Sequence, residues 1–182
     1  MKNLLLTSSG SFITGSGLNI FSKPLNKMKI AYITTASNGF DDGSYIKKNK
    51  EKMDKLGFDY EEMDIEGKNK KKLRNILKNK EAVLVEGGNT FYLLKCIRQS
   101  GFDKVIKDLI EKGVNYIGIS AGSYVCCPTI EMATWKKEYR DRCGVVDFVA
   151  MDLVPFLMFV HYDVEHKKIL KEKIVESKYD IK

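Results

Sequence analysis

The sequence predicts an α/β fold: a mainly parallel, doubly wound sheet flanked by helices. Short apolar runs recur along the first two thirds of the chain, and stretches with helical spacing separate them. The run at 29–35 is β-branched and apolar, which is typical of a strand buried on both faces of a parallel sheet. The 182 residues have the size of one domain, so we expect a single domain over residues 1–182.

Apolar runs locate the strands. Four of them are predicted as strands, at residues 3–7, 29–35, 82–85 and 114–119, and a further strand is predicted at 58–65, where apolar and polar residues alternate loosely. The pattern weakens after Pro128, where two further apolar runs follow at residues 145–149 and 155–160. Residues 179–182 resemble the start of one more strand, and we therefore expect a shortened C-terminus.

Helical spacing and stop signals locate the helices. They are predicted at residues 45–56, 68–80, 91–99, 103–112 and 165–177. Ser44 is a candidate N-cap for the first helix, and Gly57 is its candidate stop signal. The second helix carries apolar residues at helical spacing on a lysine-rich background, which indicates an amphipathic surface helix.

The net charge of +7 comes mostly from lysine, because only four of the 31 basic residues are arginines. Nucleic-acid readers favour the arginine fork for bases and phosphates, so we expect no nucleic-acid partner. The lysines between Lys47 and Lys80 are interpreted as a solvated surface, with a weak polyanion contact as the alternative. No apolar run approaches the ~20 residues that cross a bilayer, and no membrane span is expected.

Cysteine usage indicates a reducing compartment. Cys96, Cys126, Cys127 and Cys143 contain no CxxC pair, and the chain has only two histidines to assist them. A disulfide framework or a zinc site is therefore not expected. The apolar start of the chain is too short for the core of a signal peptide, and we expect a cytoplasmic protein.

One five-residue pattern, Gly118-Ile119-Ser120-Ala121-Gly122, has the form GxSxG and follows a predicted buried strand. A sharp strand-to-helix turn leaves the serine side chain standing free at the carboxyl edge of the sheet. The helix N-terminus then directs free N–H groups to the same point. Ser120 is thus a candidate nucleophile, and the amide of Ala121 a candidate oxyanion donor. The alternative is a small-residue turn between sheet and helix.

A second turn, Glu86-Gly87-Gly88-Asn89-Thr90, follows the strand at 82–85. It should reach the same sheet edge, where α/β sheets bind ligands. The paired glycines allow close approach of the backbone to a ligand, so the Gly88 amide is a second candidate oxyanion donor, and Asn89 a candidate substrate-binding residue. The alternative is a helix N-cap by Asn89 or Thr90.

A serine nucleophile requires a base, and the chain offers His161 and His166. His161 ends the apolar run at 155–160 and is expected at a strand end. His166 lies among charged residues at a predicted helix start and is expected to be exposed. We therefore take His161 as the candidate base, with a structural histidine as the alternative.

The stretches VEGGNTFYLLKCI and GISAGSYVCCPTI, followed by LVPFLMFVHYD, resemble peptidase family S51. Its members include the aspartyl dipeptidase peptidase E and, more distantly, cyanophycinase. The resemblance implies a fold like that of class I glutamine amidotransferases, with serine in place of their cysteine. It also implies a serine hydrolase of short peptides, notably those with N-terminal aspartate, without a metal or organic cofactor. Ser120 then matches the nucleophile, His161 the base, and Gly88 and Ala121 the oxyanion positions.

The sequence departs from the family at the triad acid. In peptidase E the corresponding aspartate follows a threonine-rich stretch, whereas here Trp135 stands in its place. Trp135 is also expected to reshape the specificity pocket. The third member of the triad is unassigned, and four carboxylates are the candidates: Asp163, Glu131, Glu138 and Asp141.

The leading hypothesis is thus a serine peptidase that acts on short peptides. The alternative is a catalytically weak relative that binds a small ligand or a partner protein, because the acid is missing and the C-terminus is short. A third hypothesis is a polyanion binder that uses the lysine-rich face. The oligomeric state is open, with a homodimer as one option.

Overall fold

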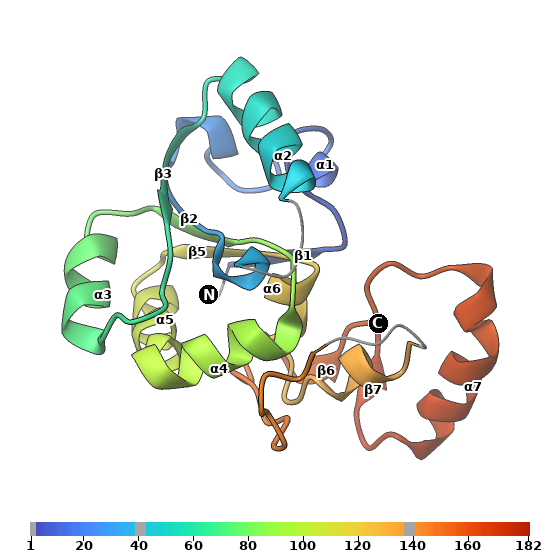
Figure 1. Cartoon of the computed structure of the whole chain (residues 1–182). Helices are drawn as coiled ribbons and strands as arrows, with labels where there is room; N and C mark the ends of the chain where they lie inside the picture. Colours follow the sequence, from blue (N-terminus) through green and yellow to red (C-terminus); the bar gives the residue numbers. More distant parts are fainter. Residues whose placement is uncertain (1–2, 39–42, 137–140) are drawn as a thin grey trace.

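The computed structural model describes residues 3–38, 43–136 and 141–182, and its centre is a five-stranded sheet (Figure 1). The strands are β1 (Leu4–Thr7), β2 (Lys29–Ile33), β3 (Asp59–Met63), β4 (Ala82–Val85) and β5 (Asn115–Ile119). Their order is β1-β5-β4-β2-β3, and every neighbouring pair is parallel. The predicted α/β fold with a parallel sheet is therefore confirmed.

Helices cover both faces of this sheet, as the apolar runs predicted. On β2, Ile30 and Tyr32 belong to one apolar cluster with α1 (Gly10–Ile13) and α2 (Ser44–Lys55). Ala31 and Ile33 alternate with them and belong to a second cluster on the other face. That face packs against four helices (Figure 1): α3 (Lys70–Leu77), α4 (Thr90–Ser100), α5 (Phe102–Glu111) and α6 (Ala121–Tyr124).

The start of α2 differs from the prediction. Ser44 is the first residue of the helix rather than its cap, and Gly43 occupies the N-cap position with φ of 63°. Glycine adopts this left-handed conformation without the Cβ penalty that other residues meet. The chain therefore enters α2 through a glycine turn, one residue before the expected cap.

Short elements make up the C-terminal segment, residues 125–182. They are the 3₁₀ helices η3 (Glu131–Thr134) and η4 (Val164–His166), the helix α7 (Lys167–Glu176), and the strands β6 (Phe156–Leu157) and β7 (Asp180–Ile181). β7 is the strand expected at the chain end, but it pairs in parallel with β6 and does not extend the main sheet. The apolar run at 145–149 forms only an isolated bridge between Val149 and Thr129. His161 lies beyond β6, outside a strand, contrary to the expectation of a strand end.

The lysine-rich stretch forms α2, β3 and α3, and most of its lysines are exposed. Two of them pair with acidic side chains on β3: Lys50 with Glu62, and Lys80 with Glu61 at 2.8 Å. Much of the charge therefore lies in solvent, as the solvated-surface interpretation requires. Within the described ranges, the helices all fall short of the length and apolarity that would let one cross a membrane.

Candidate active site

The GxSxG pattern forms a sharp turn between β5 and α6, with Ser120 at its corner. Ser120 has φ of 51° and ψ of −106°, a backbone conformation that residues other than glycine rarely adopt. A Cβ added to Gly118 would lie 2.5 Å from the Gly122 carbonyl oxygen, and one added to Gly122 would lie 2.2 Å from the Val85 carbonyl oxygen. Both positions thus require glycine, because the turn presses against its own backbone and against β4.

Two polar side chains that the sequence reasoning missed hold this turn. The Tyr116 hydroxyl donates to the Gly122 carbonyl at 2.8 Å. The Ser123 hydroxyl lies 2.7 Å from the Gly118 carbonyl and accepts from the Thr7 amide at 3.1 Å. These contacts tie the turn to β1 and β5. Tyr116 and Ser123 are fully buried, which the structure shows but no local sequence pattern marks.

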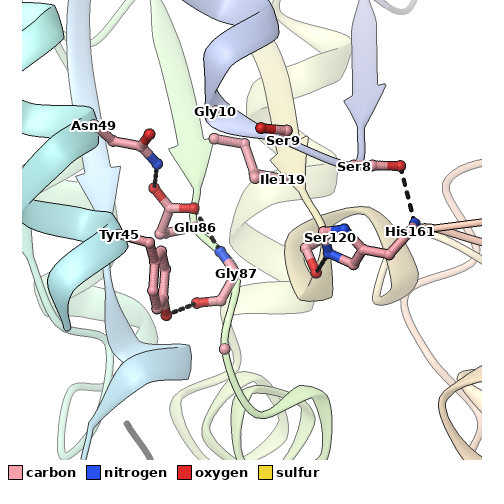
Figure 2. A pocket seen from close by; sticks show the side chains of 11 residues that line it. Ser8, Ser9, Gly10, Tyr45, Asn49, Glu86, Gly87, Ile119, Ser120 and His161 are labelled. Atoms are coloured by element: carbon pink, nitrogen blue, oxygen red, sulfur yellow. Dashed lines mark hydrogen bonds between the residues drawn. The ribbon is translucent and has the colours of Figure 1, made fainter. Parts of the chain in front are cut away.

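The structure brings His161 to Ser120 across 41 residues of sequence. Its Nε2 lies 2.8 Å from the Ser120 Oγ (Figure 2). The His161 amide donates to the Ser8 hydroxyl at 3.3 Å, and φ of His161 is 53°. The Lys136 ammonium donates to the carbonyls of Val160 at 2.8 Å and His161 at 3.4 Å. Backbone contacts on both sides therefore orient a histidine whose φ is unusual.

The second turn contributes backbone rather than side chains. Gly88 has φ of 138°, and a Cβ there would lie 2.2 Å from the Ala36 carbonyl oxygen. The Asn89 Oδ1 accepts from the amides of Phe91 and Tyr92 at 2.9 and 3.0 Å, and its Nδ2 donates to the Asp141 carbonyl at 2.8 Å. Asn89 is thus the N-cap of α4, the alternative that the sequence left open, and it does not line the pocket at Ser120.

A pocket of about 290 Å³ opens beside the Ser120–His161 pair (Figure 2). Its walls are the turns after β1, β4 and β5, the start of α2, and His161. The lining residues are Ser8, Ser9, Gly10, Tyr45, Asn49, Glu86, Gly87, Gly88, Ile119, Ser120 and His161. A smaller hollow on the other side of the pair includes Thr90 and Lys136. Ser120 is therefore accessible from a cavity large enough for part of a small molecule.

The candidates for the triad acid lie at different places. The Asp163 side chain caps η4, and its amide donates to the His166 Nδ1 at 3.0 Å. The Asp141 Oδ1 accepts from the Cys143 amide at 2.8 Å. Glu131 begins η3, and Glu138 lies outside the described residues. The side chains of Asp163 and Asp141 are thus hydrogen-bonded to backbone amides near them, and the identity of the acid stays a prediction.

Trp135 lies away from the pocket at Ser120. Its ring stacks on Phe159 with 6.2 Å between centroids, and it lines a separate pocket against α7. His166 packs edge-on against the same Phe159 and is partly buried, not exposed as expected. Trp135 therefore packs against Phe159 in the C-terminal segment and does not line the pocket at Ser120. Over the residues that the structure covers, no group of three or more His, Cys, Asp or Glu side chains could hold a metal ion.

Fold and site together define an α/β protein with a serine–histidine pair at the carboxyl edge of a parallel sheet. A family model for peptidase family S51 matches residues 4–180. The uncharacterized peptidase Lmo0363 of Listeria monocytogenes is 31% identical over 175 residues, which cover 96% of this chain and 85% of that protein. Peptidase E of a Nostoc species is 31% identical over 134 residues, or 74% of this chain and 52% of that protein.

Solved structures agree with this match. A crystal structure of a Listeria monocytogenes protein classed with peptidase E superposes with a TM-score of 0.84 at 31% identity, covering 100% of this chain and 89% of that one. A peptidase from an acI-B1 actinobacterium shares the fold, with a TM-score of 0.62 at 16% identity over 92% of this chain and 74% of that one. The chain belongs to peptidase family S51, which confirms the predicted family and makes it a peptidase.

Proposed function

We propose that this chain is a serine peptidase that hydrolyses short peptides, with Ser120 as nucleophile and His161 as general base. The observation that carries the proposal is the 2.8 Å contact between the His161 Nε2 and the Ser120 Oγ. A serine needs such a partner because its hydroxyl is a weak nucleophile near neutral pH. Membership of family S51 supports the same reaction class.

The proposed reaction has two stages. The Ser120 Oγ attacks the peptide carbonyl carbon while His161 takes the hydroxyl proton, which gives a tetrahedral oxyanion. His161 then returns the proton to the leaving amine as the C–N bond breaks, and an acyl-enzyme forms. A water molecule, deprotonated by the same imidazole, attacks the ester, and the imidazolium returns this proton to the Ser120 Oγ as the ester C–O bond breaks and the acid is released. Every proton that moves therefore passes through one side chain.

The amides of Gly88 and Ala121 are the proposed oxyanion donors. Ala121 opens α6, so its amide is one of the helix N-terminal groups without an intrahelical acceptor. Gly88 follows β4 and is held close to Ala36 by the Asn89-to-Ala36 backbone hydrogen bond of 2.7 Å. Gly87 separates these two turns, since a Cβ on Gly87 would lie 3.1 Å from the Ser120 Cβ. Both amides thus belong to backbone that is packed around the nucleophile.

Labelling with a fluorophosphonate tests this assignment directly, because the reagent reacts with an activated serine. We expect labelling of the wild-type protein, none of Ser120→Ala, and at least ~100-fold slower labelling of His161→Ala. Ser177→Ala and His166→Ala are the matched controls, since both residues lie around α7, and both should label normally. Folded wild-type protein that resists labelling would contradict the proposal.

The proposed substrates are short peptides in the cytoplasm, with dipeptides as the first to test. The resemblance to the aspartyl dipeptidase peptidase E motivates dipeptides with N-terminal aspartate as one class, and curated relatives carry the name peptidase E. A dipeptide library, screened for hydrolysis by mass spectrometry, would give the preferred residues on both sides of the bond.

The second candidate function is that of a catalytically weak relative that binds a small ligand or a partner protein, and the position of Trp135 favours it. Trp135 stands where the resemblance places the acid, and it packs on Phe159 rather than near Ser120. An imidazole without its orienting acid loses on the order of 10⁴ in turnover. This candidate predicts thermal stabilisation by dipeptides without hydrolysis, and the same stabilisation in Ser120→Ala.

A further inference from the structure

The pocket beside Ser120 contains a buried carboxylate, Glu86, that the proposed reaction does not use. Glu86 is 1% exposed and yet lines the pocket. Its Oε2 accepts from the Tyr32 hydroxyl and from the Asn49 Nδ2 at 3.0 Å, and its Oε1 accepts from the Gly87 amide at 2.9 Å. Figure 2 shows this group on one side of the pocket and the Ser120–His161 pair on the other.

All three of these donors are neutral, which leaves the charge of Glu86 uncompensated. No lysine, arginine or histidine in the described part of the chain forms an ion pair with it. Buried carboxylates are rarely left without a cation, because removing the charge from water is costly. A carboxylate has about four acceptor directions, and three are used here, two of them on Oε2. A ligand that brings a positive charge into the pocket would complete the arrangement.

We propose that Glu86 binds the α-ammonium group of the substrate's first residue. This inference rests on the proposed function and extends it, because it makes the enzyme act at a free N-terminus. The α-ammonium nitrogen is two bonds from the carbonyl carbon that Ser120 attacks, roughly 2.5 Å away. It must therefore lie near both Ser120 and the turn after β4.

The turn after β4 brings Glu86 next to the residue that faces Ser120. Its Oε1 is hydrogen-bonded to the Gly87 amide, and a Cβ on Gly87 would lie 3.6 Å from the Ser120 Oγ. One glycine thus separates the carboxylate from the nucleophile. A lysine or arginine side chain carries its charge several bonds further from the scissile carbonyl, so the α-ammonium fits this short separation better.

Glu86→Gln is the informative variant because it removes the charge and keeps the shape. The glutamine oxygen still accepts from Gly87, while the Tyr32 hydroxyl can turn to accept and the Asn49 amide can flip. We expect kcat/KM for peptides with a free amine to fall ~30-fold. N-acetylated versions of the same peptides should be poor substrates of both proteins and differ less than threefold between them. An equal loss for both peptide series would overturn the proposal.

Fluorophosphonate labelling separates recognition from chemistry, since the reagent carries no ammonium group. Glu86→Gln should label at the wild-type rate, and a large fall in labelling would show that Glu86 only supports the fold of the site. Glu81→Gln is the matched control, because Glu81 precedes β4 at the opposite sheet edge and pairs with Lys23. It should hydrolyse both peptide series at the wild-type rate.

Ligand-induced thermal shifts keep the inference testable if the wild-type protein neither labels nor hydrolyses peptides. Alanine amide should raise the Tm of the wild-type protein more than that of Glu86→Gln, and N-acetyl-alanine amide should raise neither. Equal shifts by alanine amide would overturn the inference independently of catalysis. Nα-acetyl-lysine amide has a blocked α-amine and a free side-chain ammonium. If it stabilises the protein in a way that requires Glu86, the carboxylate binds a side-chain cation, which would contradict the α-ammonium assignment.

Discussion

Ser120 and His161 are held by two parts of the molecule that differ in construction. Ser120 belongs to the sheet region, residues 3–124, where β4 and β5 are buried along their whole length. His161 belongs to the C-terminal segment, residues 125–182, in which α7 buries no residue and β6 and β7 have two residues each. His161 itself is exposed, whereas Gly122 and Ser123 behind Ser120 are buried.

This difference separates the stability of the fold from the geometry of the site. The nucleophile turn is part of the packing between β4 and β5, so a change there affects folding and activity together. The histidine is positioned by a few polar contacts, chiefly from Ser8 and Lys136. A change in those contacts should reduce activity and leave the sheet intact.

Gly122→Ala should have the largest effect, because its Cβ would lie 2.2 Å from the Val85 carbonyl oxygen. The backbone of either β4 or α6 must move, and we expect a loss of about 3 kcal/mol in unfolding free energy together with most of the activity. Urea unfolding followed by circular dichroism measures the first effect, and peptide hydrolysis the second.

Gly113→Ala is its control. Gly113 has φ of 92° but open space around its Cβ position, so only backbone strain is expected, at a cost of about 1 kcal/mol. Gly122→Ala with wild-type stability would show that the turn is less tightly packed than the structure indicates.

Lys136→Met should reduce activity with little loss of stability. It removes the ammonium that donates to the carbonyls of Val160 and His161. We expect kcat to fall ~10-fold, because a small displacement of the base weakens proton transfer, while the unfolding free energy changes by less than about 1 kcal/mol.

Lys136→Arg, which keeps the charge and donors, should recover part of the activity. Lys168→Met is the control for loss of a lysine, since Lys168 is exposed on α7. A large fall in stability with Lys136→Met would mean that the C-terminal segment is integral to the sheet region.

Most strands were predictable because apolar residues run together and are buried, as in Ala82–Val85, where the predicted and observed bounds coincide. β3 is the exception, since most of its residues are exposed. Helix caps were less predictable, since Ser44 and Gly43 both favour helix starts and only the backbone conformation distinguishes them. In the C-terminal segment the apolar run at 145–149 forms only one isolated bridge. Its residues Val146 and Val149 are exposed, at 91% and 62%, so apolar character there does not reflect burial.

The candidate site was predictable where residue type limits the choice. Only two histidines exist, and Ser120 lies in the recognisable GxSxG pattern, so the pair could be proposed before the structure. Glu86 was named only as the start of a turn, because its burial depends on Tyr32 and Asn49 from two other elements. Lys136 and Ser8 act through backbone contacts with a distant segment, and no local pattern signals such contacts.

Asp64→Asn tests how much one half-buried carboxylate contributes to the stability of the sheet region. Burial opposes ionisation of Asp64, but hydrogen bonds from Thr35, the Glu66 amide and Asn38 lower its pKa overall. A lowered pKa gives stability that is present above the unfolded value of about 3.9 and is lost as pH falls through the folded value. We therefore expect a deficit of about 1 kcal/mol in unfolding free energy at pH 7 that disappears as the pH falls below the folded pKa, measured by urea unfolding. A deficit that is unchanged at low pH would exclude the charge as its source.

Thiol labelling gives the smallest effect but compares the two regions within one protein. Burial raises the pKa of both Cys96 and Cys127 to about 11, so at pH 8 only about one in 10³ is thiolate. Cys143 is partly exposed and should react first with iodoacetamide. In urea below the unfolding transition, Cys127 at the start of the C-terminal segment should be labelled before Cys96 on α4, because α7 buries no residue and β6 and β7 have two residues each. Equal labelling rates, read by mass spectrometry, would show that the two regions open together and that His161 is as firmly held as Ser120.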